Sequence, residues 1–202
     1  MGIKERRQRE KRATRDGILE AAKTIARTEG WGAVTVRKLA DAIEYSPPTI
    51  YEYFDNKDAV LSEVVQDGFT ELTRELRRAS RQSTVPEEQL LAIALAYYCF
   101  SRDQPELYRI MHGMGGVALD AEAVATNAQL AGAVSQGVLH NWAVENAVQL
   151  DELEAVELLW STLHGLTILG ANNRLEGGDE RAERLIARAI RDFLTAWRVQ
   201  GA

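Results

Sequence analysis

Residues 35–57 read TVRKLADAIEYSPPTIYEYFDNK, and this stretch decides the fold. Thr35 and Ser46 each precede a short segment suited to a helix, and Pro47 fits the first position of the second segment. That second segment is polar and aromatic on its outer positions. Two short helices joined by a tight turn are the layout of a helix-turn-helix, which places its second helix in the DNA major groove.

The charge of the chain is distributed unevenly around this stretch. Residues 1–57 carry 12 Lys and Arg against 9 Asp and Glu, whereas residues 58–202 carry 12 against 21. Seven of the basic residues lie within residues 1–15, from Lys4 to Arg15. We expect this segment to be either a solvated helix start or a flexible arm that contacts phosphates or the minor groove. One end of the chain therefore suits DNA, and the acidic remainder suits another task.

Apolar residues recur at helical spacing through almost the whole chain, and strand signals are few. We expect an all-α fold of about nine helices. We divide it into a three-helix DNA-binding domain at residues 1–57 and a helical ligand-binding and dimerisation domain at residues 58–202. The expected helices span about residues 12–29, 36–42, 47–54, 57–78, 86–100, 105–112, 120–146, 151–172 and 179–199.

The N-terminal motifs resemble the DNA-binding domain of TetR-type transcriptional regulators. The matching segments are Ile18–Ala22, Glu29-Gly30, Thr35–Ala40 and Ser46–Lys57. The resemblance implies that Thr49 and Tyr51 touch bases or nearby backbone, and that Thr35, Tyr53 and Lys57 contact phosphates. The DNA-binding residues we predict are Thr35, Arg37, Ser46, Pro47, Thr49, Tyr51, Tyr53 and Lys57.

Alternatives remain for some of these residues. Arg37 lies where some members of the family reach a base, but a surface salt bridge would also explain it. Tyr51 and Tyr53 could be packing residues. Glu44 stands where the family often has Gly. A left-handed backbone there would cost a side chain about 1 kcal/mol, so either the preceding helix ends differently or the strain is tolerated.

Residues 58–202 contain polar-tipped and polarizable side chains that a plain core would not need, because buried His and Tyr require hydrogen-bond partners. The resemblance implies a mainly apolar effector pocket in this region. Core packing remains the alternative for each residue taken singly. The predicted ligand-binding residues are Tyr97, Tyr108, Met111, His112, Trp142, Trp160 and His164.

Two further features of this region follow from the resemblance. Trp160, His164 and Gly165 are similar to the signature of a TetR subgroup named for its Trp, His and Gly, and residues 105–111 fit the same subgroup. The last two long helices, about residues 151–172 and 179–199, are amphipathic. In the family such helices form a four-helix bundle across a two-fold axis, which implies a homodimer.

The sequence therefore predicts a homodimeric, ligand-responsive regulator, a repressor that a small apolar or aromatic effector releases from a palindromic operator. A ligand-independent DNA-architectural protein is the alternative, and an enzyme is not expected because no catalytic spacing occurs. No metal site or cofactor is expected either. Cys99 is the single cysteine, and no apolar run has the ~20 residues that cross a membrane. The expected location is the cytoplasm.

Overall fold

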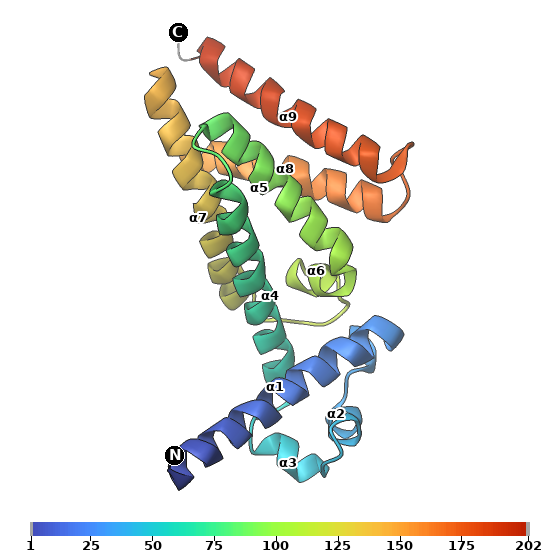
Figure 1. The fold of residues 1–202 in the computed structure, drawn as a ribbon. Helices are drawn as coiled ribbons and strands as arrows, with labels where there is room; N and C mark the ends of the chain where they lie inside the picture. The colour runs from blue at the N-terminus through green and yellow to red at the C-terminus, as the bar shows by residue number, and fades with distance from the viewer. Residues whose placement is uncertain (1, 201–202) are drawn as a thin grey trace. The chain divides into compact units, whose positions relative to one another are not determined.

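The computed structural model describes residues 2–200, and within that range it contains nine α-helices, one short 3-10 helix and no strand (Figure 1). The all-α prediction is therefore confirmed. The α-helices are α1 Ile3–Glu29, α2 Val36–Ala42, α3 Pro47–Tyr51, α4 Lys57–Ser80, α5 Pro86–Asp103, α6 Pro105–Met111, α7 Ala121–Asn146, α8 Glu152–Ala171 and α9 Gly178–Gln200. The 3-10 helix is Trp31–Ala33.

The described residues form two compact units that interleave along the chain. The first unit holds the chain up to Gly68 together with Glu106–Ala125. The second unit holds Phe69–Pro105 together with the chain from Thr126 onward. Helices α4 and α7 each contribute to both units. The predicted division into functional domains after residue 57 remains a prediction. Residues 1, 201 and 202, which belong to the two predicted domains, lie outside the described part of the chain.

The core of the first unit comes from the apolar faces of α1, α2 and α3. Ile18, Leu39 and Ile50 are fully buried there. Thr35 caps α2 as expected, because its hydroxyl accepts a hydrogen bond from the Lys38 backbone N–H at 3.2 Å. Gly30 ends α1 with a φ of 81°, a conformation that favours glycine.

Helix α1 begins at Ile3 and not near residue 12, so the predicted start was wrong. The extension has no stripe of buried apolar residues, so apolar periodicity did not predict it, but its residues are good helix formers. The Glu5 side chain accepts from the Gly2 N–H at 3.0 Å, and Arg6 pairs with Glu10 one turn later at 2.8 Å. The basic segment is therefore helical, and its contact with DNA remains a prediction.

Helix α3 ends at Tyr51, three residues earlier than predicted. Ser46 occupies its N-cap position but makes no side-chain bond to the backbone. The reason is that Pro47 and Pro48 have no N–H to donate, and the Thr49 N–H already bonds the Ser46 carbonyl at 2.9 Å. The Ser46 hydroxyl instead pairs with the Thr49 hydroxyl at 3.2 Å.

Glu44 has a φ of 59°, so the strained alternative for the turn is the one observed. The Tyr45 N–H bonds the Ala40 carbonyl at 2.9 Å, and the Glu44 N–H bonds the Asp41 carbonyl at 3.3 Å. This pair of bonds is a Schellman motif, which closes α2 with a left-handed residue. The turn between α2 and α3 is thereby fixed despite the side chain at Glu44.

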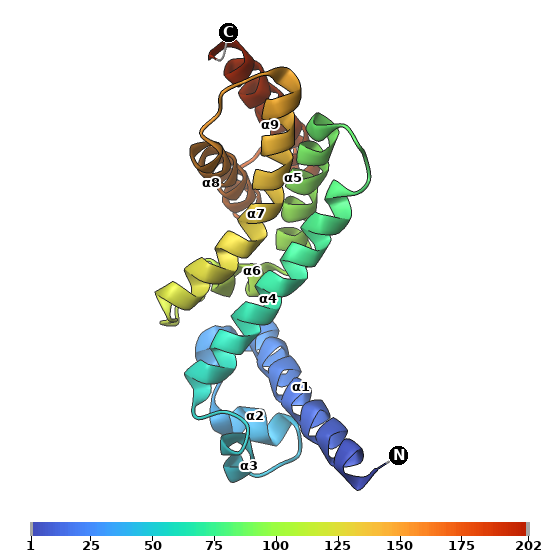
Figure 2. The same cartoon turned by 90° about the vertical axis from the view of Figure 1, so that its left-hand side faces the viewer.

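In the second unit, α5, α8 and α9 pack on one another (Figures 1 and 2). The Tyr98 hydroxyl donates to Asp179 at 2.8 Å and so ties α5 to the start of α9. Burial and this hydrogen bond raise the pKa of Tyr98 to about 12. The Trp142 indole N–H donates to Glu87 at 3.0 Å, linking α7 to α5. No helix of the described chain is long and apolar enough to cross a membrane.

Candidate nucleic-acid interface and effector site

The outward faces of α2 and α3 present most of the predicted DNA-binding residues to solvent. Arg37, Ser46 and Pro47 are exposed, and Tyr51 is 57% exposed. Thr35 is also exposed, while Thr49, Tyr53 and Lys57 are half-buried. An aromatic ring as exposed as that of Tyr51 adds little to a core, so the packing alternative does not explain this residue.

Two predicted contact residues carry charges that are uncompensated locally. Within residues 2–200, neither Arg37 nor Lys57 has an acidic partner within 4.0 Å, so the salt-bridge alternative for Arg37 does not hold. Lys57 begins α4, where the helix dipole favours an anion. The preceding Asn56 caps that helix by accepting from the Ala59 N–H at 2.9 Å. A phosphate at this helix start would meet both the cation and the dipole.

A groove of about 700 Å³ lies between the N-terminal half of α1 and the α2–α3 segment. Its basic lining comes from Lys4, Arg7 and Lys11, and its other wall includes Thr49 and Tyr53. The Lys11 ammonium lies 5.9 Å from the centre of the Tyr53 ring. The structure therefore brings the basic segment beside the recognition helix.

Arg15 is a residue whose role the sequence did not reveal, because its charge was grouped with the basic segment. It forms an ion pair with Glu63 and donates to the Tyr53 carbonyl at 3.1 Å. Its guanidinium also lies 4.4 Å from the centre of the Phe54 ring. Arg15 thus ties α1 to the segment that follows α3 and to α4.

Three of the predicted ligand-binding residues meet in the second unit. The rings of Tyr97 and Trp160 are 4.4 Å apart in an edge-to-face arrangement. The Tyr97 hydroxyl lies 3.4 Å from Nδ1 of His164. Burial lowers the pKa of His164 below its usual value, which keeps the imidazole neutral near pH 7.

Two buried polar atoms beside this cluster have no hydrogen-bond partner among the described residues, Nε1 of Trp160 and the hydroxyl of Thr167. Both lie on the same face of α8 as His164. Gly132 of α7 packs beside this indole, since a Cβ at that position would be in ordinary contact with Trp160 Nε1 at 3.7 Å. An unsatisfied buried donor costs about 1–3 kcal/mol, so the Trp160 N–H is a destabilising feature of the protein as it stands.

The other four predicted ligand-binding residues lie elsewhere. The rings of Tyr108 and His112, in the first unit, lie with centres 4.4 Å apart and planes tilted by 50°. Met111 is fully buried against Gly68, where a Cβ would come within 2.7 Å of its sulfur. Trp142 packs in the second unit beside Trp197 and bonds Glu87. Among the seven predicted residues, Tyr97, Trp160 and His164 therefore form a polar-tipped cluster that includes the unsatisfied N–H of Trp160. We call these three residues, with Thr167, the α8 cluster.

Comparison with known proteins identifies two matching regions. Residues 18–64 match the family described as bacterial regulatory proteins, tetR family. Residues 90–193, about half of the chain, match the family described as tetracyclin repressor-like, C-terminal domain. Within residues 2–200 no group of three or more His, Cys, Asp and Glu side chains could hold a metal ion.

Whole-chain similarity extends across both regions. The chain is 26% identical over 186 residues to YobS, an uncharacterized HTH-type transcriptional regulator of Bacillus subtilis (strain 168), covering 90% of this chain and 91% of that protein. A protein of unknown function from Rhodococcus sp. RHA1 has a similar structure, with a TM-score of 0.81 at 21% identity over 92% of this chain and 95% of that one. A TetR family transcription regulator from Marinobacter aquaeolei VT8 gives 0.71 at 22% identity, covering 93% and 97%.

Proposed function

The chain belongs to the TetR family of bacterial regulatory proteins, and from this premise we propose that it is a homodimeric repressor released from a palindromic operator by a small effector. Its membership makes it a DNA-binding transcriptional regulator rather than an enzyme. The direction of regulation, the effector and the dimer interface belong to the proposal. The cytoplasm, as the compartment in which the protein acts, is also part of the proposal.

The observation that carries the DNA-binding proposal is the exposed face of α2 and α3 with two unpaired cations at its edges, Arg37 and Lys57. In this proposal Thr49 and Tyr51 contact bases or nearby backbone, while Thr35, Tyr53 and Lys57 hold phosphates. Phosphate contacts would fix the register, and base contacts would give the sequence preference.

The dimer proposal rests on the outer faces of α8 and α9. On α8, Leu158 is 41% exposed and Leu169 is 38% exposed. Gly165 lies between them on the same face with open space around it, which permits close approach of a second helix. On α9, Leu185 and Phe193 are only half-buried. A two-fold dimer through these helices would supply the two recognition helices that a palindrome requires.

The effector proposal rests on the α8 cluster. An apolar or aromatic body would pack on Tyr97 and Trp160, and an acceptor group would take the Trp160 N–H, which has no partner among residues 2–200. A ligand can shift the DNA-binding equilibrium only by its different affinity for two states. We propose that occupied protein favours the state whose recognition helices no longer fit successive major grooves.

The alternative function is a ligand-independent architectural protein, which would bind many sequences with a steep salt dependence. Nuclease footprinting of genomic fragments separates the two. A repressor protects a short near-palindrome in the presence of excess random DNA, whereas an architectural protein protects no preferred site.

The same assay tests the role of Lys57. Lys57→Ala should weaken binding to every sequence and reduce the slope of log affinity against log salt by about one. Lys38→Ala is the matched control, because Lys38 pairs with Glu29 and should leave the slope nearly unchanged. If the wild type and Lys57→Ala give equal slopes, Lys57 does not contact a phosphate and the proposal for this residue is wrong.

A further inference from the structure

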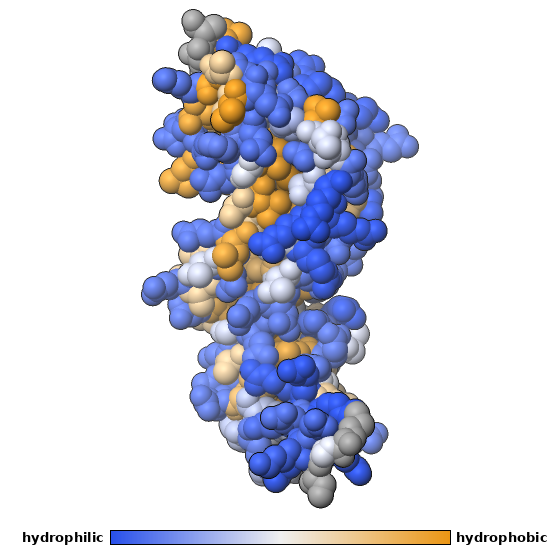
Figure 3. Space-filling model, turned by 60° about the vertical axis from the view of Figure 1, so that its left-hand side comes forward, coloured by the Kyte–Doolittle hydropathy of each residue, from blue (hydrophilic) through white to orange (hydrophobic). Residues whose placement is uncertain are grey.

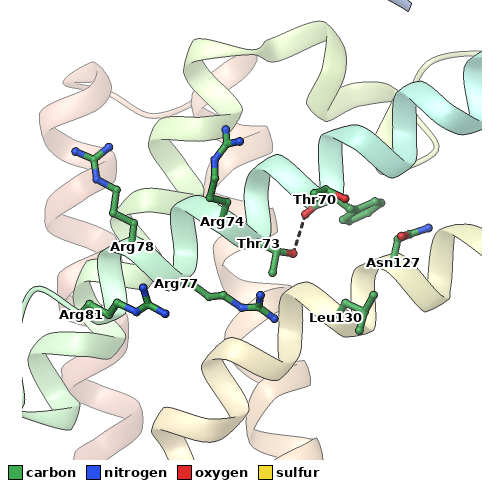
Figure 4. Close-up of a pocket in the computed structure, with 9 residues that line it drawn as sticks. Thr70, Thr73, Arg74, Arg77, Arg78, Arg81, Asn127 and Leu130 are labelled. Atoms are coloured by element: carbon green, nitrogen blue, oxygen red, sulfur yellow. Dashed lines mark hydrogen bonds between the residues drawn. The ribbon is translucent and has the colours of Figure 1, made fainter. Parts of the chain in front are cut away.

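A recess in the second unit has a lining unlike that of the α8 cluster. It is a groove of about 530 Å³ between the C-terminal half of α4 and α7 (Figure 4). Arg74, Arg77, Arg78 and Arg81 line it, and no acidic residue does. No member of the α8 cluster lines it either.

The four arginines occur within eight residues; Arg74, Arg77 and Arg78 lie in the last turns of α4, and Arg81 follows in the turn after it. Arg74 and Arg78 both approach Glu75, at 3.6 and 3.7 Å, and these exposed pairs are weak. Arg77 and Arg81 have no acidic partner within 4.0 Å anywhere in residues 2–200. This concentration of positive charge stands in a part of the chain, residues 58–202, that is acidic as a whole.

The helix dipole explains part of the charge, because cations near a helix C-terminus are stabilising. It does not explain the apolar surface beside the cations. Phe69 and Leu130 line the groove; Phe69 is buried, and Leu130 supplies exposed apolar surface at 57%. Figure 4 shows Arg77 extending from α4 toward α7, on which Leu130 lies. Figure 3 shows apolar surface bordered by strongly hydrophilic side chains on the face occupied by α4 and α7.

We propose that this groove binds a small amphipathic anion, a carboxylate or phosphate ester joined to an apolar body. The planar guanidinium fork matches carboxylate and phosphate oxygens in paired hydrogen bonds, and Arg77 and Arg81 have this capacity unused. The apolar body would cover Leu130 and remove its exposed apolar surface from water. Charge and apolar surface together select this class over a neutral lipid or a bare ion. The inference concerns ligand binding to the second unit and does not depend on DNA binding.

Calorimetry on the full chain tests it with four probes below their micelle concentrations. Dodecanoate and dodecyl phosphate carry the two candidate head groups, dodecanol has the tail without charge, and inorganic phosphate has charge without a tail. We expect at least one of the anionic amphiphiles to bind at least tenfold more tightly than dodecanol and phosphate. Whichever of the two binds identifies the head group. Failure of both, or equal binding of dodecanol, overturns the proposal.

Variants locate the site. Arg77→Gln combined with Arg81→Gln should weaken binding of the preferred amphiphile about tenfold or more, since hydrogen bonds to charged groups are strong. Arg184→Gln on α9 is the control, because that exposed residue lies outside the groove. Trp160→Phe should leave this binding unchanged, which separates the groove from the α8 cluster. Unchanged binding in the Arg77/Arg81 variant overturns the proposal.

Two further outcomes reassign the groove. If the Arg77/Arg81 variant loses affinity for random DNA but keeps its affinity for the amphiphile, the arginines serve nucleic acid and the proposal fails. If the variant changes from dimer to monomer in sedimentation while amphiphile binding persists, the groove faces a second copy of the chain and the proposal fails equally. Melting temperatures of all variants confirm that the exposed substitutions leave the fold intact.

Discussion

Glu44 shows how a single backbone angle affects stability. Its φ of 59° costs a residue with a Cβ about 1–2 kcal/mol. Glycine would avoid this strain but would lose about 0.5–1 kcal/mol, because the unfolded chain gains conformational entropy. Glu44→Gly should therefore raise the free energy of unfolding by roughly 0.5–1 kcal/mol in denaturant titration. Asp41→Gly, within α2, should lower it by about as much. A stabilising effect from both would point to charge rather than backbone strain.

Trp160 is the residue on which the effector proposal is tested most sharply. Trp160→Phe removes an N–H that has no acceptor, whereas Trp142→Phe removes one bonded to Glu87. The two changes delete equal volume, so Trp142→Phe should be the more destabilising by about 1–3 kcal/mol. Trp160→Phe should nevertheless weaken operator release by an aromatic probe such as 2-naphthol.

The control for this comparison is the wild-type response to the same probe, measured by operator fluorescence anisotropy. If Trp160→Phe destabilises as much as Trp142→Phe and keeps the full response, the α8 cluster is a packing arrangement. The effector would then bind elsewhere.

At the scale of elements, the helical extension of α1 gives the basic segment a defined direction. Lys4 and Arg7 line the groove beside α3, whereas Arg6 pairs with Glu10. Lys4→Gln with Arg7→Gln should lower the slope of log affinity against log salt by about two, with the ranking of operator variants unchanged. Arg6→Gln should change the slope less. A changed ranking would mean that the extension reads a groove directly.

The helix boundaries show what local sequence can predict. Capping and turn residues predicted α2, α5 and α6 within about three residues, because these signals act over a single turn. The start of α1 escaped prediction, since apolar periodicity begins only where a helix meets the core. The short α3 escaped it too, because the Ser46–Thr49 contact depends on local geometry.

The candidate sites were predictable to different degrees. The DNA face follows from a contiguous motif, so Thr49 and Tyr51 could be named from it. The α8 cluster joins Tyr97 to residues of α8 that lie 63 or more positions away, and spacing along the chain does not reveal that they meet. Arg15 was missed because its partner Glu63 lies 48 residues away.

At the scale of the whole molecule, the outer face of α8 should determine assembly. Leu158→Glu with Leu169→Glu places two charges on the proposed dimer surface, and buried like charges repel and lose hydration. Sedimentation should show a monomer that binds the operator at least tenfold more weakly. Leu153→Glu is the control, since it is 63% exposed on a different face of α8. If the double variant stays dimeric, the dimer interface lies on other helices.

The interleaving of the two units has a consequence for anyone who wishes to transplant the DNA-binding head into a chimaera. The Trp31 indole N–H, buried in the first unit, donates to the Glu106 carbonyl at 2.8 Å, and Met111 fills the space beside Gly68. A graft cut near residue 57 or 68 would leave that N–H without its acceptor and that surface uncovered. Specificity swaps among such regulators should therefore exchange outward-facing side chains of α2 and α3, or transfer residues 106–125 together with the head.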